Sequence, residues 1–324
     1  MFGLRPHLPD TVSAMTGPII TLTLNPALDV SSAVKMVVPD HKLRGDRAVF
    51  EPGGGGVNVA RVCRRLGVDA MAVVPIGGTI GDKVGQLLDA ESLPWLAVPV
   101  SEETRQSFSI TEAESGNQYR FVLPGPALTD AEITDCRNAV LDAAAETDCV
   151  VISGSLPRDA DPRIVTELVQ AMPGKSVIVD TSSGALKASL QSGARLIKPS
   201  ARELANLVDR SLETEDDIEQ AATEVLASSN VEILVASIGP GGAIAVAADG
   251  ERVRVRAPTV KVRSAVGAGD SMVAGLAIGL HRGESLADTV ALGVAAGTAT
   301  VLSDGTGLCA AHDVERLLAR VTTA

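Results

Sequence analysis

Aromatic side chains are scarce in this chain of 324 residues: phenylalanine, tyrosine and tryptophan together make up 2% of it. Hydrophobic residues nevertheless reach 45%, so the core has to be built from Ala, Val, Leu and Ile. That composition excludes a core of packed rings and suits buried parallel strands that are covered by helices. The length allows one large α/β domain with a small appendage.

Cysteine and histidine are also rare, with four residues of each. No two cysteines form a C-x-x-C pair, and no histidine is spaced from a cysteine or an acidic residue as in a metal site. This usage disfavours a disulfide framework and a zinc site. We expect unpaired thiols in a cytoplasmic protein, at Cys63, Cys136, Cys149 and Cys309.

The chain lacks both an excess of positive charge and a long apolar run. Its formal net charge is −12 at pH 7, which argues against nucleic acids and anionic membranes as partners. No apolar run is long enough to span a bilayer. Residues 1–16 lack the apolar centre of a secretion signal, so we interpret them as a loose N-terminal extension of a domain that spans residues 17–324.

Short apolar runs alternate with segments of helical spacing along most of the chain. The expected strands cover residues 19–24, 70–76, 149–153, 176–180, 195–198 and 232–237, followed by a hairpin of 243–247 and 252–256. The expected helices include residues 57–66, 82–90, 269–281, 286–302 and 312–320. This alternation predicts right-handed βαβ units that build a parallel sheet.

A small second sheet is expected from the first half of the chain. Residues 30–50 alternate apolar and polar side chains, which suits an open sheet with one wet face. Two further alternating segments, 105–111 and 118–123, flank a turn that contains Gly116. We therefore expect a β lid from about residues 30–50 and 104–124 that stands off the main body.

The run from Gly267 to Gly275 carries the most specific signal for function. A glycine turn and one carboxylate, Asp270, stand at the head of an apolar stretch with helical character. Helix starts attract anions because their first N–H groups are free and their dipole end is positive. Asp270 either complements that dipole or takes a proton from a group that attacks the anion, which would indicate phosphoryl transfer.

Four successive glycines, residues 53–56, precede a segment of helical spacing. They form either a tight strand-to-helix turn or a backbone that a ligand approaches closely, and the entropy cost of four glycines favours the ligand. Asn58 stands where a dinucleotide-binding loop needs its third glycine, so that fingerprint fails. The amide of Asn58 is suited to sugar hydroxyls. Residues 174–176 also fail as a P-loop, because Val169 replaces the leading glycine.

Other polar positions have both a structural and a functional interpretation. Asp29 follows an expected strand end, where α/β sheets bind ligands, or it forms a turn after Pro26. Lys42 and Arg105 on the expected lid either protect a sheet edge or hold a sugar phosphate.

Two further segments stand at the ends of expected strands. The spacing of Ser200 and Glu203 alone favours a simple capping box at a helix start. Residues 237–242 form either a hairpin turn or a floor under a nucleotide.

Taken together, these motifs make the chain similar to a known family. It resembles the ribokinase-like carbohydrate kinases and, within them, looks very like the small bacterial phosphofructokinases of the B type. The resemblance runs from about residue 19 to near the C-terminus. The segments that carry it are residues 21–29, 50–61, 118–125, 153–157 and 267–275.

The resemblance implies a three-layer α/β/α sandwich with a small β-sheet lid, through which this branch forms homodimers. It implies ATP as the phosphoryl donor, Mg²⁺, and a monovalent cation such as K⁺. The expected reaction is phosphorylation of fructose 6-phosphate at the 1-hydroxyl. Tagatose-6-phosphate kinase, 1-phosphofructokinase and a catalytically silent phosphosugar sensor are the alternatives, whereas the failed fingerprint at Asn58 disfavours a dinucleotide oxidoreductase.

Matching the family's motifs residue by residue implies roles for individual positions. Asp270 would be the base, over the backbone of Gly267, Ala268 and Gly269. The sugar phosphate would be held by Asp29, Lys42, Gly53, Gly54, Asn58, Arg105 and Ser153. Nucleotide and magnesium-bound water would be held by Lys198, Ser200, Glu203, Ser237, Gly239 and Gly242. The monovalent cation would be held by Ser264, Val266, Thr300, Ser303 and Gly305.

Three positions depart from the family's usual pattern. Ser200 replaces an asparagine and has no amide donor, which weakens the expected magnesium–phosphate network. Ser107 stands where an asparagine is common, which puts one sugar contact in doubt. Arg158 and Asp159 replace a common Pro-Gly pair, which alters a loop near the sugar.

Overall fold

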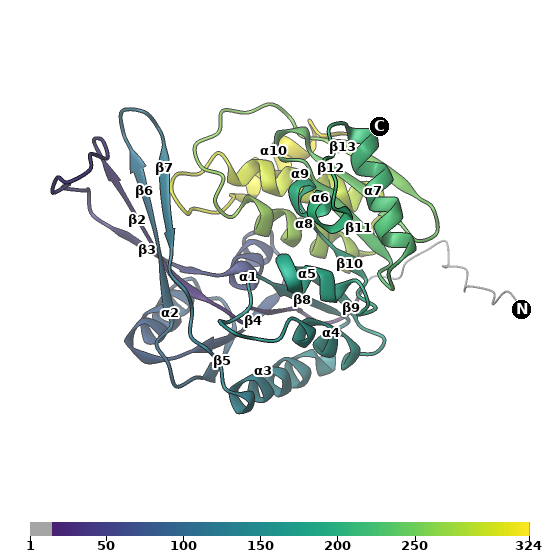
Figure 1. Ribbon diagram of the computed structural model, residues 1–324, viewed down its shortest axis with the longest axis horizontal. Coiled ribbons are helices and arrows are strands. Elements are labelled where there is room, and N and C mark those ends of the chain that lie inside the picture. Colours follow the sequence, from purple (N-terminus) through teal and green to yellow (C-terminus); the bar gives the residue numbers. More distant parts are fainter. Residues whose placement is uncertain (1–14, 324) are drawn as a thin grey trace, which may run out of the picture.

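The computed structural model describes residues 15–323 and contains two sheets, a large one in the body and a small one beside it (Figure 1). The large sheet has ten strands, in the spatial order β14 (Thr322–Thr323), β13 (Arg252–Arg256), β12 (Ala243–Ala247), β11 (Ile233–Ser237), β10 (Leu196–Ile197), β9 (Ser176–Asp180), β8 (Cys149–Ser153), β1 (Ile19–Leu22), β4 (Ala70–Ile76) and β5 (Trp95–Pro99). The strands from β11 to β5 are parallel, and β12, β13 and β14 continue the sheet antiparallel.

Helices cover both faces of the large sheet, which makes the body a three-layer α/β/α sandwich. One face packs against α1 (Gly55–Arg65), α2 (Gly78–Ala90), α8 (Ala268–Arg282), α9 (Leu286–Thr300) and α10 (Ala311–Leu318). The other packs against α3 (Asp130–Ala143), α4 (Arg163–Gln170), α5 (Ser183–Ser189), α6 (Ala201–Val208) and α7 (Glu215–Ala227). Successive strand residues alternate between the two cores, as Ile19 and Ile20 do in β1. Both faces are therefore apolar, which is why the strands are near-continuous hydrophobic runs.

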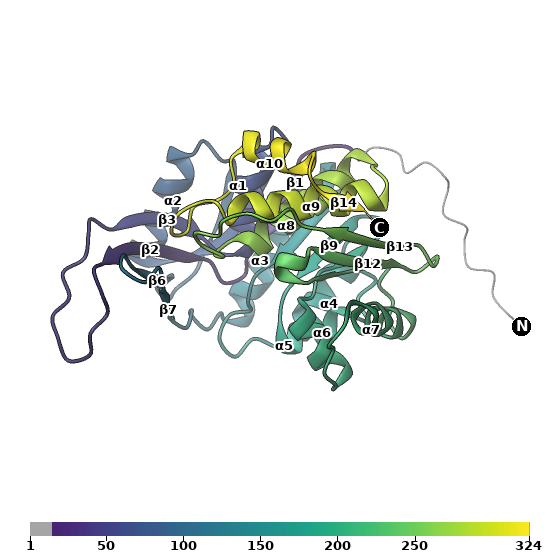
Figure 2. The same cartoon turned by 90° about the horizontal axis from the view of Figure 1, so that it is seen from above.

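The small sheet has the strand order β3 (Val49–Gly53), β2 (Ala27–Val34), β6 (Arg105–Glu112) and β7 (Gln118–Val122). It confirms the predicted lid, but the prediction of one alternating segment over residues 30–50 is wrong. Residues 35–48 contain no strand and extend away from the body as a connection between β2 and β3 (Figure 2). Pro39 cannot donate to a ladder, and glycine weakens a strand at Gly45. Lys42 therefore lies on an exposed loop instead of on the sheet.

Most predicted elements match the structure closely, and the deviations have local causes. The predicted strands 70–76, 149–153, 176–180, 243–247 and 252–256 coincide with β4, β8, β9, β12 and β13. The predicted strand at 195–198 shrinks to the two residues of β10, because Pro199 follows and has no amide hydrogen. The edge strand β5 was not predicted, since only one of its five residues is fully buried.

The boundary of the predicted N-terminal extension needs a correction. Residues 1–14 lie outside the described part of the chain, but residues 15 and 16 are bonded to the body. The Met15 amide donates to the His281 carbonyl at 2.8 Å, and the Thr16 amide donates to Asp148 Oδ2 at 3.0 Å. Residues 15 and 16 therefore belong to the domain and not to the predicted extension.

The described residues also bear on the expectations from composition. All four cysteines are free and buried, as expected. Within residues 15–323, no helix is long and apolar enough to cross a bilayer. In the same part of the chain, no three histidine, cysteine or acidic side chains are grouped so that they could hold a metal ion.

Candidate active site between the body and the lid

The parallel strands bring three polar side chains together at one edge of the large sheet. Ser153 pairs in register with Asp180, and Lys198 follows β10 beside them. The Lys198 ammonium lies 3.1 Å from Asp180 Oδ1, and the Ser153 hydroxyl donates to Asp180 Oδ2 at 3.5 Å. Burial opposes the charge on Lys198, but Asp180, Glu203 and Asp270 together raise its pKa above the ordinary value. This edge therefore holds a permanent buried cation.

Helix α8 begins beside that cation with an open first turn. Its N-cap, Gly267, has a φ of 75° and makes no side-chain cap. The positive φ favours glycine, and a Cβ at this position would lie 2.6 Å from Leu308 Cδ2 and displace that methyl group. The Lys198 ammonium lies 3.9 Å from the point where a Cβ on Gly269 would stand. The Ala268 amide donates weakly to the Ala265 carbonyl at 3.4 Å, and no side chain caps the turn. The positive end of the helix dipole and an ammonium thus face the same small volume, which suits an anion.

Asp270 lies in this first turn and accepts a hydrogen bond from Asn58 Nδ2 at 2.8 Å. The pKa of Asp270 is raised to about 6, and burial is the largest cause. The hydrogen bond from the Asn58 amide and the charge of Lys198 lower this pKa, whereas the charges of Asp180 and Asp29 raise it. The carboxylate is therefore mostly ionised at pH 7 yet basic enough to accept a proton. A pKa close to the working pH is the property that general base catalysis requires.

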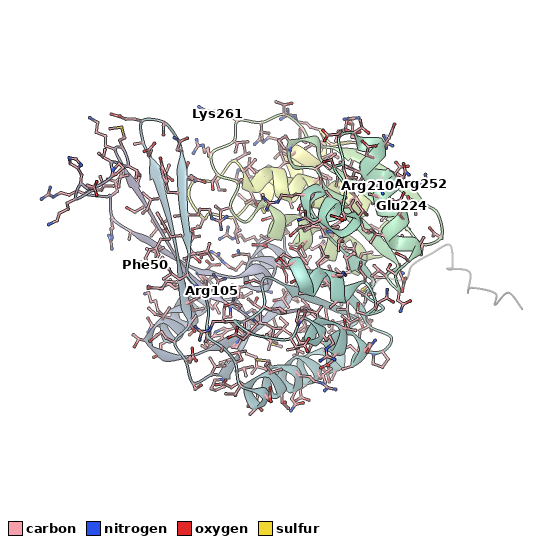
Figure 3. All side chains as sticks on the ribbon, in the orientation of Figure 1. Phe50, Arg105, Arg210, Glu224, Arg252 and Lys261 are labelled. Carbon is pink, nitrogen blue, oxygen red and sulfur yellow. The ribbon has the colours of Figure 1, made fainter. Side chains whose placement is uncertain are left out.

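The lid supplies a second carboxylate and an arginine. Asp29 is part of strand β2, so the alternative of a turn at this position is wrong. Burial raises the pKa of Asp29, and Arg105 and Arg120 oppose that rise. Arg105 lies where the lid meets the body (Figure 3), and it donates to Asn25 Oδ1 at 3.0 Å and to Ser107 Oγ at 3.2 Å. Acidic and basic groups thus line the side of the lid that faces α8.

A cavity of about 370 Å³ opens on the far side of the α8 start. Its polar wall is the turn that follows β11, where Ser237, Gly239 and Gly242 stand. Its apolar wall includes Met272, Val294 and Val301. The turn joins the antiparallel strands β11 and β12, so the hairpin and the cavity wall are the same structure. Ala268 and Gly269 also line this cavity, which therefore reaches the open amides.

Comparison with known proteins agrees with this geometry. The model of the pfkB family of carbohydrate kinases matches residues 23–313. The chain belongs to this family. It is 42% identical over 305 residues to ATP-dependent 6-phosphofructokinase isozyme 2 of Escherichia coli K12, covering 93% of this chain and 98% of the relative. The protein of that name from Mycobacterium tuberculosis H37Rv is 41% identical over 304 residues, covering 92% and 88%.

Solved structures of family members have the same fold. The crystal structure of phosphofructokinase-2 from Escherichia coli with substrates and products has a TM-score of 0.89 and 41% identity, covering 94% of this chain and 99% of that one. An Arabidopsis thaliana ribokinase complexed with ribose and ATP has a TM-score of 0.72 at 18% identity, covering 93% and 98%, and shares the fold alone. The predicted ribokinase-like architecture is confirmed.

The glycine loop of this pfkB kinase serves contacts within the protein. A Cβ on Gly53 would collide with the Asp29 carboxylate, and a Cβ on Gly55 would collide with the Ser153 hydroxyl. Gly54 has a φ of 110°, a conformation that L side chains rarely adopt. Contacts within the protein already require these glycines, since the lid strand, the α1 start and the loop after β8 meet there. Close approach of a ligand to this loop stays a prediction. The loop still places Asn58 against Asp270.

Ser200 and Glu203 form the simple capping box that their spacing favours. The Ser200 hydroxyl accepts from the Glu203 amide, and Glu203 Oε2 accepts from the Ser200 amide at 2.8 Å and from its hydroxyl at 2.7 Å. One carboxylate oxygen of Glu203 is thus occupied by the helix start. The roles of both residues toward nucleotide and magnesium stay predictions.

The five residues matched to the family's cation site lie in two segments that pack together, a loop at residues 264–266 and the end of α9 with the loop that follows it. The Ser264 hydroxyl donates to the Gly305 carbonyl at 2.6 Å and accepts from the Val266 amide at 3.2 Å. The Ser303 amide donates to the Thr300 carbonyl at 2.9 Å. The Thr300 hydroxyl also bonds Ser271 in α8, so both loops adjoin the start of that helix.

Other predicted residues are not brought together, and two important ones were missed. Lys42 makes no hydrogen bond or ion pair with any other predicted site residue in the described part of the chain. Asp180 and Arg61 were not predicted, although both connect to predicted site residues. The position of Asp180 at the carboxyl end of a parallel strand is a signal that would have found it. Arg61 has no such signal in the sequence.

Proposed function

We propose that this chain transfers the γ-phosphoryl group of ATP to the 1-hydroxyl of fructose 6-phosphate, giving fructose 1,6-bisphosphate and ADP. The observation that carries the proposal is Asp270, a buried base among the open amides of α8 and the Lys198 ammonium. Identity favours this substrate over the alternatives. Relatives named 6-phosphofructokinase isozyme 2 are 41–42% identical, whereas those named 1-phosphofructokinase or tagatose-6-phosphate kinase are 29–31% identical.

Asp270 accepts the proton of the sugar hydroxyl as its oxygen attacks the γ-phosphorus. A new O–P bond forms, the bond from that phosphorus to the β–γ bridging oxygen breaks, and the electron pair leaves with ADP. Base catalysis of this kind contributes roughly 10²–10⁴-fold. The amides of Gly267, Ala268 and Gly269 and the Lys198 ammonium stabilise the charge that develops on the phosphoryl group. Each well-placed donor of this type is worth about 2.7–4 kcal/mol.

The sugar phosphate occupies the space between α8 and the lid. Asp29 accepts from its hydroxyls and Asn58 donates to them. Both lie near Asp270, since the charge of Asp29 raises the pKa of Asp270 and the Asn58 amide donates to its carboxylate. Arg105 binds the phosphate after exchanging its present bonds to Asn25 and Ser107. Gly53, Gly54 and Ser153 border the same space. Lys42 is assigned to the sugar phosphate from the family's motif alone, since its loop is exposed.

The nucleotide occupies the cavity beside the β11–β12 turn, with its phosphates directed at the amides of α8. The fit of magnesium rests on Glu203, which keeps Oε1 free of hydrogen bonds within the described residues. Bound there through water, Mg²⁺ would neutralise charge on the phosphates. A hard monovalent cation fits the hydroxyl and carbonyl oxygens of the loops at 264–266 and 300–305, where it would support the start of α8.

The outer face of the lid is proposed to form a homodimer. The strand register places Asp29 and Ser107 on one face of the small sheet and Phe50, Phe108 and Phe121 on the other. Phe50 and Phe121 are 44% and 57% exposed, and Phe50 lies on the outer side of the sheet (Figure 3). An exposed apolar patch on a sheet is typical of a surface that binds another chain. A cytoplasmic location stays a prediction.

The experiment that tests this function is a panel of kcat/KM values with Mg-ATP. The acceptors are fructose 6-phosphate, fructose 1-phosphate, tagatose 6-phosphate and the unphosphorylated sugars. We expect fructose 6-phosphate to give the largest value, with ADP released in equal amount. A larger value for another phosphosugar would replace the proposed substrate. No turnover with any acceptor, together with saturable sugar-phosphate binding, would indicate a sensor.

A further inference from the structure

Arg61 is a buried arginine, 3% exposed, that lies one helical turn after Asn58 on α1. Its Nε donates to Glu91 Oε2 at 2.9 Å, and its Nη2 donates to Glu51 Oε1 at 3.2 Å. Its Nη1 donates to the Pro52 carbonyl at 3.0 Å and to Asn58 Oδ1 at 3.3 Å. The guanidinium is therefore fixed by two carboxylates and a carbonyl, and it still has a hydrogen for the asparagine.

The contact with Asn58 determines how that side chain is oriented. An asparagine amide has one end that accepts and one end that donates, and a guanidinium can only donate. The oxygen of Asn58 therefore faces Arg61, and its NH₂ group faces Asp270, to which it donates at 2.8 Å. If the amide turned over, its NH₂ would meet the arginine and its oxygen would meet the carboxylate. Arg61 thus excludes the orientation that would repel the base.

We propose that Arg61 is a positioning residue for the phosphoryl transfer: it holds the amide of Asn58 so that the amide donates to Asp270. The inference rests on the proposed role of Asp270 as the base. It adds a residue that never touches the substrate but determines in which pH range the base is ionised.

The charges around Asp270 make this donor important. Asp180 at the end of β9 and Asp29 on β2 both oppose ionisation of Asp270, and Lys198 after β10 favours it. Asn58 on α1 supplies the hydrogen bond that helps the carboxylate to stay charged among these groups. Losing that donor, or reversing it, leaves two carboxylates against one ammonium. Asp270 would then hold its proton up to a higher pH.

The acidic partners of Arg61 connect this contact to the lid. Glu51 belongs to lid strand β3 and also accepts a hydrogen bond from Thr306, next to the loop that contains Gly305. Glu91 caps the end of α2. Two carboxylates around one guanidinium satisfy its buried charge, so the arginine is fixed without help from Asn58. It can therefore act as a rigid support for the asparagine.

The test compares Arg61→Met with Arg65→Met across pH 5–9, with kcat measured at saturating ATP and sugar phosphate. Arg65 follows on the same helix, approaches Glu91 at 3.9 Å and donates to the Leu308 carbonyl at 3.0 Å. It makes no bond to Asn58, so it is the matched control. We expect the acidic limb of the Arg61→Met profile to move up by about one pH unit, roughly a fivefold loss at pH 6, while Arg65→Met keeps the wild-type midpoint.

An equal loss at every pH with an unmoved midpoint in Arg61→Met would overturn the proposal. Should that variant fail to fold, Arg61→Met combined with Glu91→Met replaces the ion pair by apolar side chains and carries the same expectation. In an Asn58→Ala background there is no amide to orient, so removing Arg61 should leave the midpoint where Asn58→Ala puts it. A further shift there would contradict an action through Asn58.

Failure of this inference is distinguishable from failure of the proposed function. If Asp270→Asn turns over normally at all pH values, the base itself is misassigned. If Asp270→Asn is inactive and the Arg61→Met midpoint does not move, only the role of Arg61 is wrong.

Discussion

Two helices, α6 and α8, begin beside the same site and carry an acidic residue at the same position of their first turns. In α6, Ser200 at the N-cap and Glu203 at the third position bond each other and satisfy the helix's own amides. In α8, Gly267 at the N-cap provides no such partner, so Asp270 at the third position instead bonds Asn58 on another helix. The Glu203 carboxylate therefore stabilises its own helix, whereas the Asp270 carboxylate takes no part in capping and is available for chemistry.

The start of α8 lacks a side-chain cap because of the residue at its N-cap position. The positive φ at Gly267 strains any residue with a capping side chain, and the Leu308 methyl would have to move to admit one. In α8 no side chain caps the first turn, so its dipole end faces a phosphoryl group, whereas in α6 the Ser200 side chain already bonds the Glu203 amide. Four predictions test this difference, beginning with the largest expected effect.

Replacing Asp270 by asparagine should lower kcat by about 10²-fold or more, because the variant cannot accept the hydroxyl proton. The asparagine oxygen can still accept from Asn58, so binding of both substrates should persist. Steady-state kinetics and calorimetric titration of sugar phosphate and nucleotide measure the two parts. Turnover near the wild-type value would remove Asp270 from the mechanism.

Replacing Gly267 by alanine should lower kcat by about tenfold, because a Cβ there displaces the first turn of α8 from the phosphoryl group. Thr129→Ala is the matched control, since Thr129 caps α3 away from the site. That variant should lose about 1 kcal/mol of unfolding free energy and keep its kcat. Equal kinetic losses in both variants would mean that the start of α8 has no special role.

The Asp270→Asn protein should also be more stable than the wild type at pH 7.5. Because the folded pKa of Asp270, about 6, lies above its ordinary 3.8, the wild type loses stability as the pH rises through this window. Asparagine does not ionise, so we expect a gain of about 3 kcal/mol at pH 7.5 that vanishes below about pH 4. Urea unfolding of both proteins at pH 7.5 and at pH 4 measures the difference in unfolding free energy. An equal difference at both pH values would argue against a raised pKa for Asp270 in the folded protein.

Replacing Ser200 by alanine should cost about 1 kcal/mol of unfolding free energy, because the capping box of α6 is lost. Ser200→Asn should keep that stability, since asparagine caps as well as serine. If Ser200 also supports the nucleotide, the alanine variant will raise the KM for ATP more than the KM for the sugar. Unchanged kinetics in both variants would leave the residue as a cap alone.

Local patterns in the sequence predict most of the fold. The strands β4, β8 and β9 are buried on both faces, so their residues form apolar runs that end where polar residues begin. The connection at residues 35–48 could not be predicted from alternation, because alternating polarity also occurs in an exposed loop. The edge strand β5 lacks the burial that produces such a pattern.

Prediction of the site depended on motifs, and it failed where burial decides a residue's role. Asp270 is recognisable because a glycine turn and a helix surround it. Arg61 resembles the surface arginines Arg64 and Arg65 of the same helix, and only packing against Glu51 and Glu91 buries it. The sequence also gives no sign that Gly53 and Gly55 leave space for Asp29 and Ser153, because those two residues are distant in sequence.

The most direct test of the central claim is a crystal structure with fructose 6-phosphate and a non-hydrolysable ATP analogue. We predict that the acceptor hydroxyl lies about 2.6–3.2 Å from the Asp270 carboxylate, the distance for proton transfer. The terminal phosphate should lie against the amides of Gly267, Ala268 and Gly269. An Asp270 carboxylate separated from every sugar hydroxyl by more than one water would contradict the account.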